Sequence, residues 1–124
     1  MLLSTRIPQI EVSAFGDTFF VPGDDPLPHR ANARNAWRFM EERLSTCTYD
    51  LLVLDELALV LALDFLSMDE VIRFLDHKGS VLHVIITGRN APHALIERAH
   101  VVTEMREVKH AYAIGWPAVE GIDF

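Results

Sequence analysis

The chain has 124 residues, which is the size of one domain with a single core. Half of its residues are hydrophobic and its formal net charge is -7, which argues against a general nucleic-acid-binding surface. The longest apolar run, Leu57–Leu63, is too short to span a bilayer, and no signal segment is apparent. The single cysteine, Cys47, has no partner for an internal disulfide, which fits a reducing compartment. We therefore expect a cytoplasmic protein.

The first part of the chain is predicted to form a strand, a loop and a helix. A short strand is predicted over Ile10–Phe15, and a loop rich in Gly, Asp and Pro over Gly16–Pro28. A helix is predicted over Ala31–Leu44, because apolar residues recur three or four positions apart and form one stripe. That stripe consists of Ala33, Trp37, Met40 and Leu44.

Strands and helices are predicted to alternate from Leu51 onwards. The continuous apolar run Leu51–Leu54 is typical of a central parallel strand that is covered on both faces. A buried helix over Glu56–Phe65 follows, and a second helix begins at a capping box formed by Ser67 and Glu70. The remaining predicted elements are a strand over Val81–Thr87, a helix from Pro92 to Ala99, a last strand over Val101–Met105 and an irregular tail over Lys109–Phe124.

This alternation predicts an α/β fold in one domain over residues 1–124. We expect three layers, with a mostly parallel sheet, right-handed crossovers and helices on both faces, as in P-loop NTPases. Ligands gather at the carboxyl ends of the strands in such sheets. Three polar clusters follow predicted strands: Asp55–Glu56, Thr87–Asn90 and Glu104–His110.

The pair Asp55–Glu56 is the first candidate site. A buried strand that ends in carboxylates is the Walker B-like pattern that holds a nucleotide's magnesium in P-loop proteins. Mg²⁺ commonly takes one or two carboxylates and keeps several waters. Asp55 is therefore a candidate metal ligand, and Glu56 a candidate polarising group or base. The structural alternative is that Asp55 caps the helix that follows.

The second candidate site is Thr87-Gly88-Arg89, which follows another buried strand. Gly88 allows the backbone to turn sharply or to approach a ligand closely. The guanidinium group of Arg89 pairs well with phosphate or carboxylate. The alternative is a plain strand-to-helix turn with a surface arginine, in which Asn90 caps the next helix.

The third candidate site is Lys109–His110, which lies just after the last predicted strand. Lys109 is one of only two lysines in the chain, the other being Lys78. A ligand-facing pair and a solvated loop pair are both open at this point. The six histidines show no spacing typical of a zinc site, so we expect none.

Five blocks of the sequence carry a resemblance to a known family. They are Leu51–Glu56, Val84–Asn90, Val102–Arg106, Val108–His110 and Gly121–Phe124. In these blocks and their spacing the chain resembles the ATP:corrinoid adenosyltransferases of the P-loop type, over the C-terminal two thirds of that family. The resemblance extends back through Trp37 to Ile10, so it covers nearly the whole chain.

This resemblance implies a reaction and its ligands. In the family, Co(I) of a corrinoid (cobalamin, or the precursor cob(I)yrinic acid a,c-diamide) attacks the 5′ carbon of ATP and displaces the triphosphate. ATP, Mg²⁺ and a corrinoid are therefore the expected ligands. The protein places the reactants, and no side-chain nucleophile is expected.

The resemblance also implies roles for single residues. The catalytic positions that face magnesium and the nucleotide would be Asp55 and Glu56. The nucleotide-binding residues would be Thr87, Arg89, Lys109 and His110. The loop that contacts the corrinoid would contain Phe19 and Phe20.

Two departures from the family pattern stand out. The 124 residues contain no G-x-x-x-x-G-K-[ST] phosphate loop, so the chain looks like a form that lacks the N-terminal phosphate-loop strand. The family also has a G-F-T-W-like stretch that packs on the corrinoid. Here the matching segment is Thr18–Val21, in which Phe19 fits the family's Phe and no Trp follows.

Three functions are consistent with these observations. The first is a shortened adenosyltransferase that is weak or inactive alone, because Arg89 and Lys109 are too few to hold a triphosphate. The second is a non-catalytic relative that binds a corrinoid, a nucleotide or a protein. The third, ranked last, is a receiver-like switch phosphorylated on Asp55. Apolar composition and an unpaired sheet edge also predict a homodimer.

Overall fold

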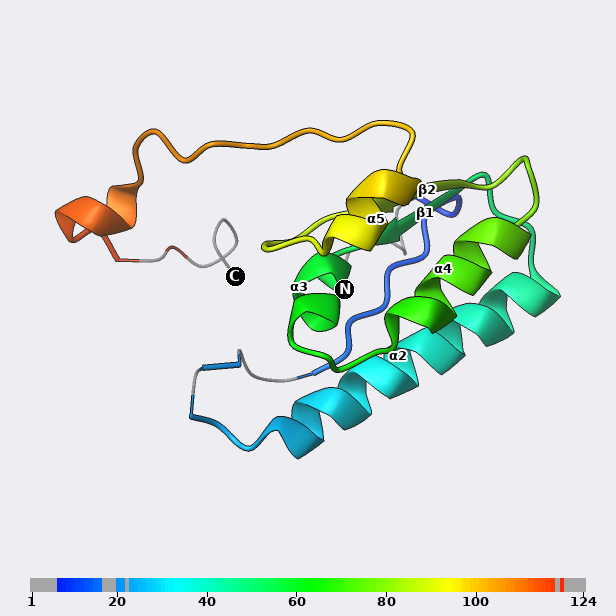
Figure 1. Ribbon diagram of the computed structural model, residues 1–124, viewed down its shortest axis with the longest axis horizontal. Helices are drawn as coiled ribbons and strands as arrows, with labels where there is room; N and C mark the ends of the chain where they lie inside the picture. The colour runs from blue at the N-terminus through cyan, green and yellow to red at the C-terminus, as the bar shows by residue number, and fades with distance from the viewer. Residues whose placement is uncertain (1–6, 17–19, 22, 118, 120–124) are drawn as a thin grey trace.

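The computed structural model describes residues 7–16, 20–21, 23–117 and 119. It has an α/β fold with a small parallel sheet, as the sequence predicted (Figure 1). In chain order the elements are α2 (Pro26–Thr46), β1 (Leu51–Leu54), α3 (Leu57–Ala62), α4 (Met68–His77), β2 (His83–Ile86), α5 (His93–Arg98) and the 3₁₀ helix η1 (Ala111–Ile114).

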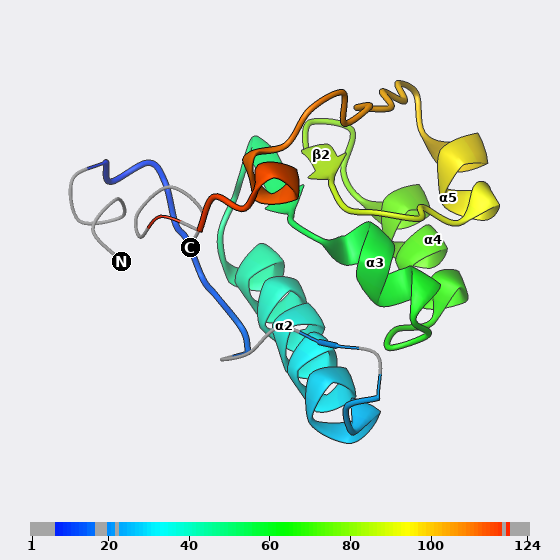
Figure 2. The same ribbon diagram turned by 90° about the vertical axis from the view of Figure 1, so that its left-hand side faces the viewer.

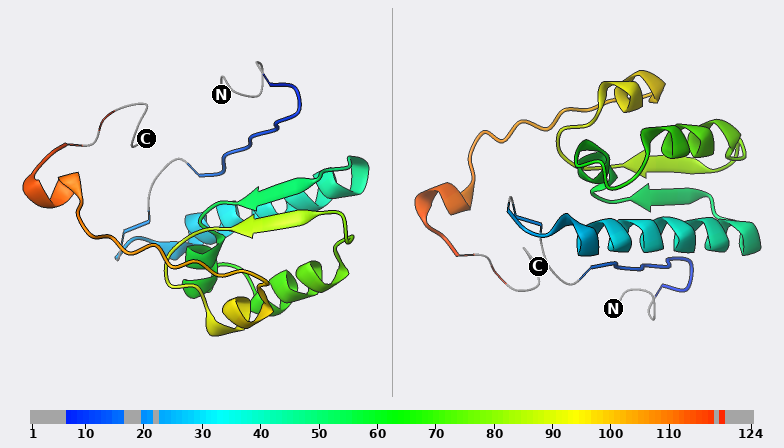
Figure 3. Two further views of the ribbon diagram at one scale, coloured as in Figure 1. Left: turned by 90° about the horizontal axis from the view of Figure 1, so that it is seen from above. Right: turned by 60° about the horizontal axis from the view of Figure 1, so that its bottom comes forward.

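The sheet consists of β1 and β2, which pair in parallel. The register sets Leu51 opposite His83 and Leu54 opposite Ile86. α3 and α4 form the crossover between the two strands, so both strands point the same way and end side by side (Figure 3). The two strand predictions from apolar runs are thereby confirmed, and they set the geometry of the candidate site.

Helix α2 begins earlier than the sequence pattern predicted. It starts at Pro26 rather than Ala31, because the carboxylate of Asp25 accepts a hydrogen bond from the N–H of Leu27 at 3.0 Å. Pro26 suits this first turn, where its missing N–H has no helical partner to lose. The predicted stripe is confirmed, since Trp37 and Met40 are buried in the core.

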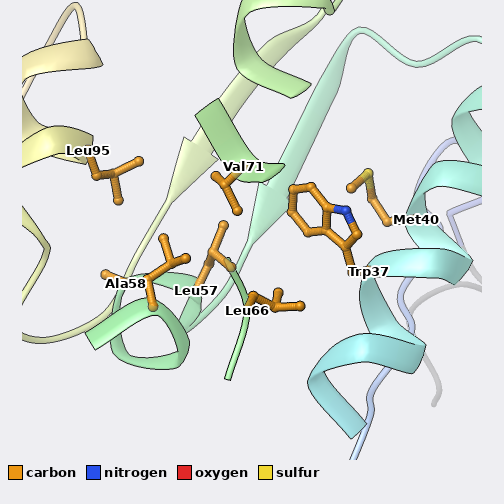
Figure 4. Close-up of a cluster of buried hydrophobic side chains, with 8 residues drawn as sticks. Trp37, Met40, Leu57, Ala58, Leu66, Val71 and Leu95 are labelled. Carbon is orange, nitrogen blue, oxygen red and sulfur yellow. The ribbon is translucent and has the colours of Figure 1, made fainter. Parts of the chain in front are cut away.

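The core lies between the helices and one face of the sheet (Figure 4). Helices α2 and α4 lie side by side (Figure 1). The rings of Trp37 and Phe74 meet edge to face at 5.5 Å. Val71 of α4 is completely buried at the centre of this cluster. The inward residues of the strands, Leu52, Leu54 and Ile86, pack against it.

The other face of the sheet is exposed. Leu51, Val53 and Ile85 are 51%, 54% and 48% exposed respectively. In the part of the chain that the structure describes, helices cover one face of β1, whereas the sequence predicted cover on both. Parallel sheets are ordinarily covered on both faces, so this apolar face is unusual for the fold class.

Two predicted strands do not form. Residues 10–15 run alongside α2 without a ladder (Figure 3), held by a ring contact between Phe15 and Phe39 at 5.3 Å. Residues 101–105 have no regular structure, and Val101 and Met105 are 82% and 92% exposed. Both segments have strand-like composition, but a strand requires a neighbour, and neither segment pairs with another described strand.

The segment before α2 is also held by charge. Glu11 Oε2 lies 2.7 Å from Nη2 of Arg43 and accepts a hydrogen bond from the Tyr49 hydroxyl at 2.6 Å. The hydrogen bond from Arg43, followed by that from Tyr49, lowers the pKa of Glu11 below its ordinary value.

None of the described helices is long and apolar enough to cross a bilayer.

Candidate functional site

The candidate site is built where β1 and β2 end. The parallel register continues past both strands, so that Thr87 N donates to the carbonyl of Leu54 at 3.2 Å. This brings Thr87 beside Asp55, and the Thr87 hydroxyl donates to Asp55 Oδ1 at 2.5 Å. The same hydroxyl oxygen accepts the backbone N–H of Glu56 at 3.0 Å. One threonine hydroxyl therefore binds the side chain of Asp55 and the backbone of Glu56.

The capping alternative for Asp55 is wrong in this structure. The residue at the N-cap of α3 is Glu56, and its side chain makes no capping hydrogen bond. Asp55 accepts a hydrogen bond from Thr87 across the strand ends instead of from a helix N–H. Glu56 has a left-handed backbone with φ 58°, which is uncommon for a residue with a side chain. This backbone turns the chain sharply from β1 into α3.

Gly88 makes the turn after β2, and its conformation requires glycine. Its φ is +132°, and a Cβ there would lie 3.0 Å from both the Cβ of Ala58 and the backbone nitrogen of Leu59. The N–H of Ala58 also donates to the carbonyl of Thr87 at 3.1 Å. The close approach at Gly88 is thus to the first turn of α3. That contact locks the two strand ends together behind Asp55 and Thr87.

The capping alternative for Asn90 is also wrong. The N-cap of α5 is Pro92, which has no capping side chain, while Asn90 adopts a left-handed backbone with φ 56°. Arg89, which precedes Asn90, is exposed and lines a shallow recess of about 220 Å³ with Glu107, His110 and residues of η1. The structure therefore places Arg89 at the surface, beside this recess.

The C-terminal segment runs out past the carboxyl ends of the strands, and η1 stands apart from the sheet and the other helices (Figure 1, Figure 3). Figure 2 looks toward these ends with η1 in the foreground. The recess brings Arg89 and His110 together, and adds Glu107 and Tyr112, which sequence reasoning missed. Lys109 does not line this recess. His110 has a structural task as well, since its Nδ1 accepts the N–H of Tyr112 at 3.1 Å and starts η1.

The loop before α2 contributes an aromatic cluster. The ring of Phe20 lies 5.2 Å from that of His29 and 5.4 Å from that of Phe65, in both cases edge to face. Phe19, the other predicted corrinoid contact, lies outside the described residues, as does the Gly121–Phe124 block. Sequence reasoning missed His29 and Phe65, because no local pattern indicates that a residue after α3 faces this loop.

Comparison with known proteins decides the family. The family model of the ATP:corrinoid adenosyltransferases BtuR/CobO/CobP matches residues 1–124. The chain belongs to this family. A corrinoid adenosyltransferase of Sinorhizobium sp is 36% identical over 110 residues, which are 88% of this chain and 51% of that protein.

Two further members give the same result. A corrinoid adenosyltransferase of Pseudomonas aeruginosa is 34% identical over 96% of this adenosyltransferase-family chain and 59% of its own length. One from Escherichia coli K12 is 37% identical over 76% of this chain and 48% of its own length. The chain therefore spans about half the length of the curated relatives that it matches.

Proposed function

We propose that this chain provides the metal–nucleotide and corrinoid contacts of an ATP:corrinoid adenosyltransferase. The observation that carries the proposal is the hydrogen-bonded set of Asp55, Thr87 and Glu56 at the carboxyl ends of two parallel strands. Ligands of α/β sheets bind at this edge. The proposed substrates are ATP and a cobalamin or a cobalamin precursor with cobalt as Co(I).

The proposed reaction needs no protein nucleophile. The lone pair of Co(I) attacks C5′ of ATP, the cobalt–carbon bond forms, and the C5′–O bond breaks. The bonding electrons leave with the triphosphate, and cobalt becomes formally Co(III). The work of the protein is to hold the two substrates in line and to exclude water.

The donor set at the strand ends fits Mg²⁺. Thr87 binds Oδ1 of Asp55, which leaves Oδ2 without a partner among the hydrogen bonds of the described residues. Mg²⁺ is commonly held by one or two carboxylates together with substrate phosphates and waters. Asp55 would hold the ion, and Glu56 would lie beside it. The ion would neutralise charge that builds on the leaving triphosphate.

The nucleotide would extend from this carboxylate set toward Arg89. Thr87 and Arg89 are two residues apart on the turn that Gly88 shapes, and His110 lines the recess that Arg89 enters. Lys109 is proposed to contribute from the same C-terminal segment as His110. Arg89 and Lys109 together cannot balance the charge of a triphosphate, and the 124 residues hold no phosphate loop.

We therefore propose weak or absent turnover for the 124-residue chain alone. A non-catalytic role in binding corrinoid or nucleotide is the second candidate, favoured by the same shortage of cations. The proposal includes a cytoplasmic location, because Co(I) needs a reducing environment. It also includes the three-layer P-loop arrangement of the sheet.

We further propose that the chain forms a homodimer. The exposed apolar face of Leu51, Val53 and Ile85 is the surface that argues for association. Sedimentation at micromolar concentration measures this directly. A monodisperse monomer would contradict the proposed homodimer, but it would not bear on the proposed substrates.

An anaerobic adenosylation assay tests the function. The purified chain, Mg-ATP and chemically reduced cobalamin are mixed, and the light-sensitive cobalt–carbon bond is followed by absorbance. We expect product formation far below that of a full-length relative. Rates equal to those of the full-length relative would refute the proposed shortage of phosphate contacts.

The Asp55→Asn variant should abolish metal-dependent ATP binding. An unchanged Kd for Mg-ATP would show that Asp55 is not part of the metal site.

A further inference from the structure

The aromatic cluster of Phe20, His29 and Phe65 joins three separate parts of the chain. Phe20 comes from the loop before α2, His29 from the first turn of α2, and Phe65 from the turn between α3 and α4. The rings of His29 and Phe65 are stacked, with centroids 6.4 Å apart and planes inclined by 17°. Phe20 meets both of them edge to face. Such contacts are the favoured geometries of aromatic pairs.

Phe65 is the fixed member of this cluster. It is 6% exposed. Its N–H donates to the carbonyl of Val60 at 3.0 Å, and the N–H of Asp64 donates to Leu61 at 3.1 Å. Asp64 itself has a left-handed backbone with φ 56°. These are the two hydrogen bonds and the backbone of a Schellman motif, which ends α3 and fixes the direction of Phe65.

Helix α3 connects this cluster to the carboxylate pair. It begins directly after Glu56 and ends three residues before Phe65. Six helical residues span about 9 Å. Its first turn is locked to the strand ends by the contact between Ala58 and Thr87. The ring of Phe20 is therefore held at a defined separation from Asp55 and Glu56 by one short and anchored helix.

We propose that Phe65 and His29 are positioning residues that hold Phe20 for contact with the corrinoid. Through α3 they set the place of the corrinoid relative to the metal–nucleotide site. This inference rests on the proposed function, in which Phe20 lies in the corrinoid-contacting loop. It assigns a role to two residues that the family resemblance left without one.

The test compares variants of the 124-residue chain by two titrations, one with cobalamin reduced to Co(II) and followed by absorbance, the other with Mg-ATP. The Phe65→Leu variant should raise the Kd for cobalamin roughly 2- to 10-fold, the size of one aromatic pair, and leave the Kd for ATP unchanged. His29→Ala should act in the same direction. His29→Phe, which keeps a ring, should bind cobalamin as the parent does.

Phe74→Leu is the matched control. Phe74 makes an edge-to-face pair with Trp37 at 5.5 Å, close to the 5.4 Å of Phe20 and Phe65, but away from the loop. An equal loss of cobalamin binding in Phe74→Leu would assign the effect to stability and overturn the inference. Unchanged cobalamin binding in Phe65→Leu would overturn it as well. If the parent chain binds no cobalamin at all, the proposed function itself fails.

Discussion

Thr87 donates a hydrogen bond to Oδ1 of Asp55, and this contact ties the end of β2 to the end of β1. The two residues are 32 positions apart in the sequence and become neighbours only through the parallel register. The hydroxyl of Thr87 also accepts the N–H of Glu56. A hydrogen bond from a neighbouring hydroxyl to a carboxylate of this kind orients the carboxylate for a metal ion.

Removal of the Thr87 hydroxyl should therefore weaken magnesium-dependent nucleotide binding. Thr87→Val keeps the shape of the side chain but loses both hydrogen bonds, so we expect the Kd for Mg-ATP to rise roughly 10-fold or more. Calorimetric titration measures it. Thr87→Ser retains the hydroxyl and serves as the control. Equal affinity of the Val variant and the parent would show that Thr87 does not orient Asp55.

Gly88→Ala should destabilise the fold. The backbone angle of +132° is strained for any residue with a side chain, and the new Cβ would lie 3.0 Å from the backbone nitrogen of Leu59. We expect a loss of roughly 1–3 kcal/mol in the free energy of unfolding, measured with urea. Gly79→Ala is the matched control, since nothing lies within 4 Å of the added Cβ. Similar losses in both variants would contradict the special role of Gly88.

Asp64→Gly should stabilise the chain slightly. Asp64 holds the left-handed position of the Schellman motif, where glycine has no Cβ penalty. The relief exceeds the extra entropy that glycine brings to the unfolded chain, and we expect a net gain of about 0.5 kcal/mol. Thermal unfolding measures it, with Asp64→Ala as the comparison that should lose stability. A less stable Gly variant would argue against the motif.

Glu11→Gln should change how stability depends on pH. Arg43 and Tyr49 lower the pKa of Glu11 from 4.5, so the folded state favours the ionised carboxylate. The stabilisation from Glu11 is therefore present above pH 4.5 and is lost as the pH falls through the lower, folded-state value. Unfolding of parent and variant should differ most at neutral pH and converge in acid.

The control for this effect is Glu41→Gln, on the exposed side of α2. It removes the same charge without touching Arg43 or Tyr49. Its unfolding free energy should stay parallel to that of the parent across the acid range. A Glu11→Gln difference that persists undiminished at low pH would show that packing of the segment, and not ionisation, carries the effect.

The sequence predicted the parts of the fold that depend on local pattern. The apolar runs predicted β1 over Leu51–Leu54 and a strand over Val81–Thr87, within which β2 spans His83–Ile86. Continuous apolar residues are typical of parallel strands, although here one face of the sheet is exposed. Because such strands end at one edge, the nearness of Asp55 and Thr87 followed in outline. The pair Asp25–Pro26 also indicates the start of α2. The predicted start was later because it followed the apolar stripe, which begins further along the chain.

Other parts depend on contacts between distant residues. The segment Ile10–Phe15 has the composition of a strand, yet Phe15 packs on Phe39 and no described strand pairs with it. The contact between Phe20 and Phe65 depends on a left-handed backbone at Asp64. Glycine at this position would indicate such a backbone in the sequence, whereas aspartate does not.

The anchoring of α3 at both ends also restricts how the chain can vary in length. Each residue added to an α-helix turns everything after it by about 100° and advances it by about 1.5 Å. One insertion within Leu57–Ala62 would rotate Phe65 away from Phe20 while the Gly88 contact held the other end in place. Insertions should be tolerated in the exposed stretch 101–108 and rejected in these six residues. The spacing between Phe65 and the carboxylate pair is thus set by the number of residues in α3 as much as by their identity.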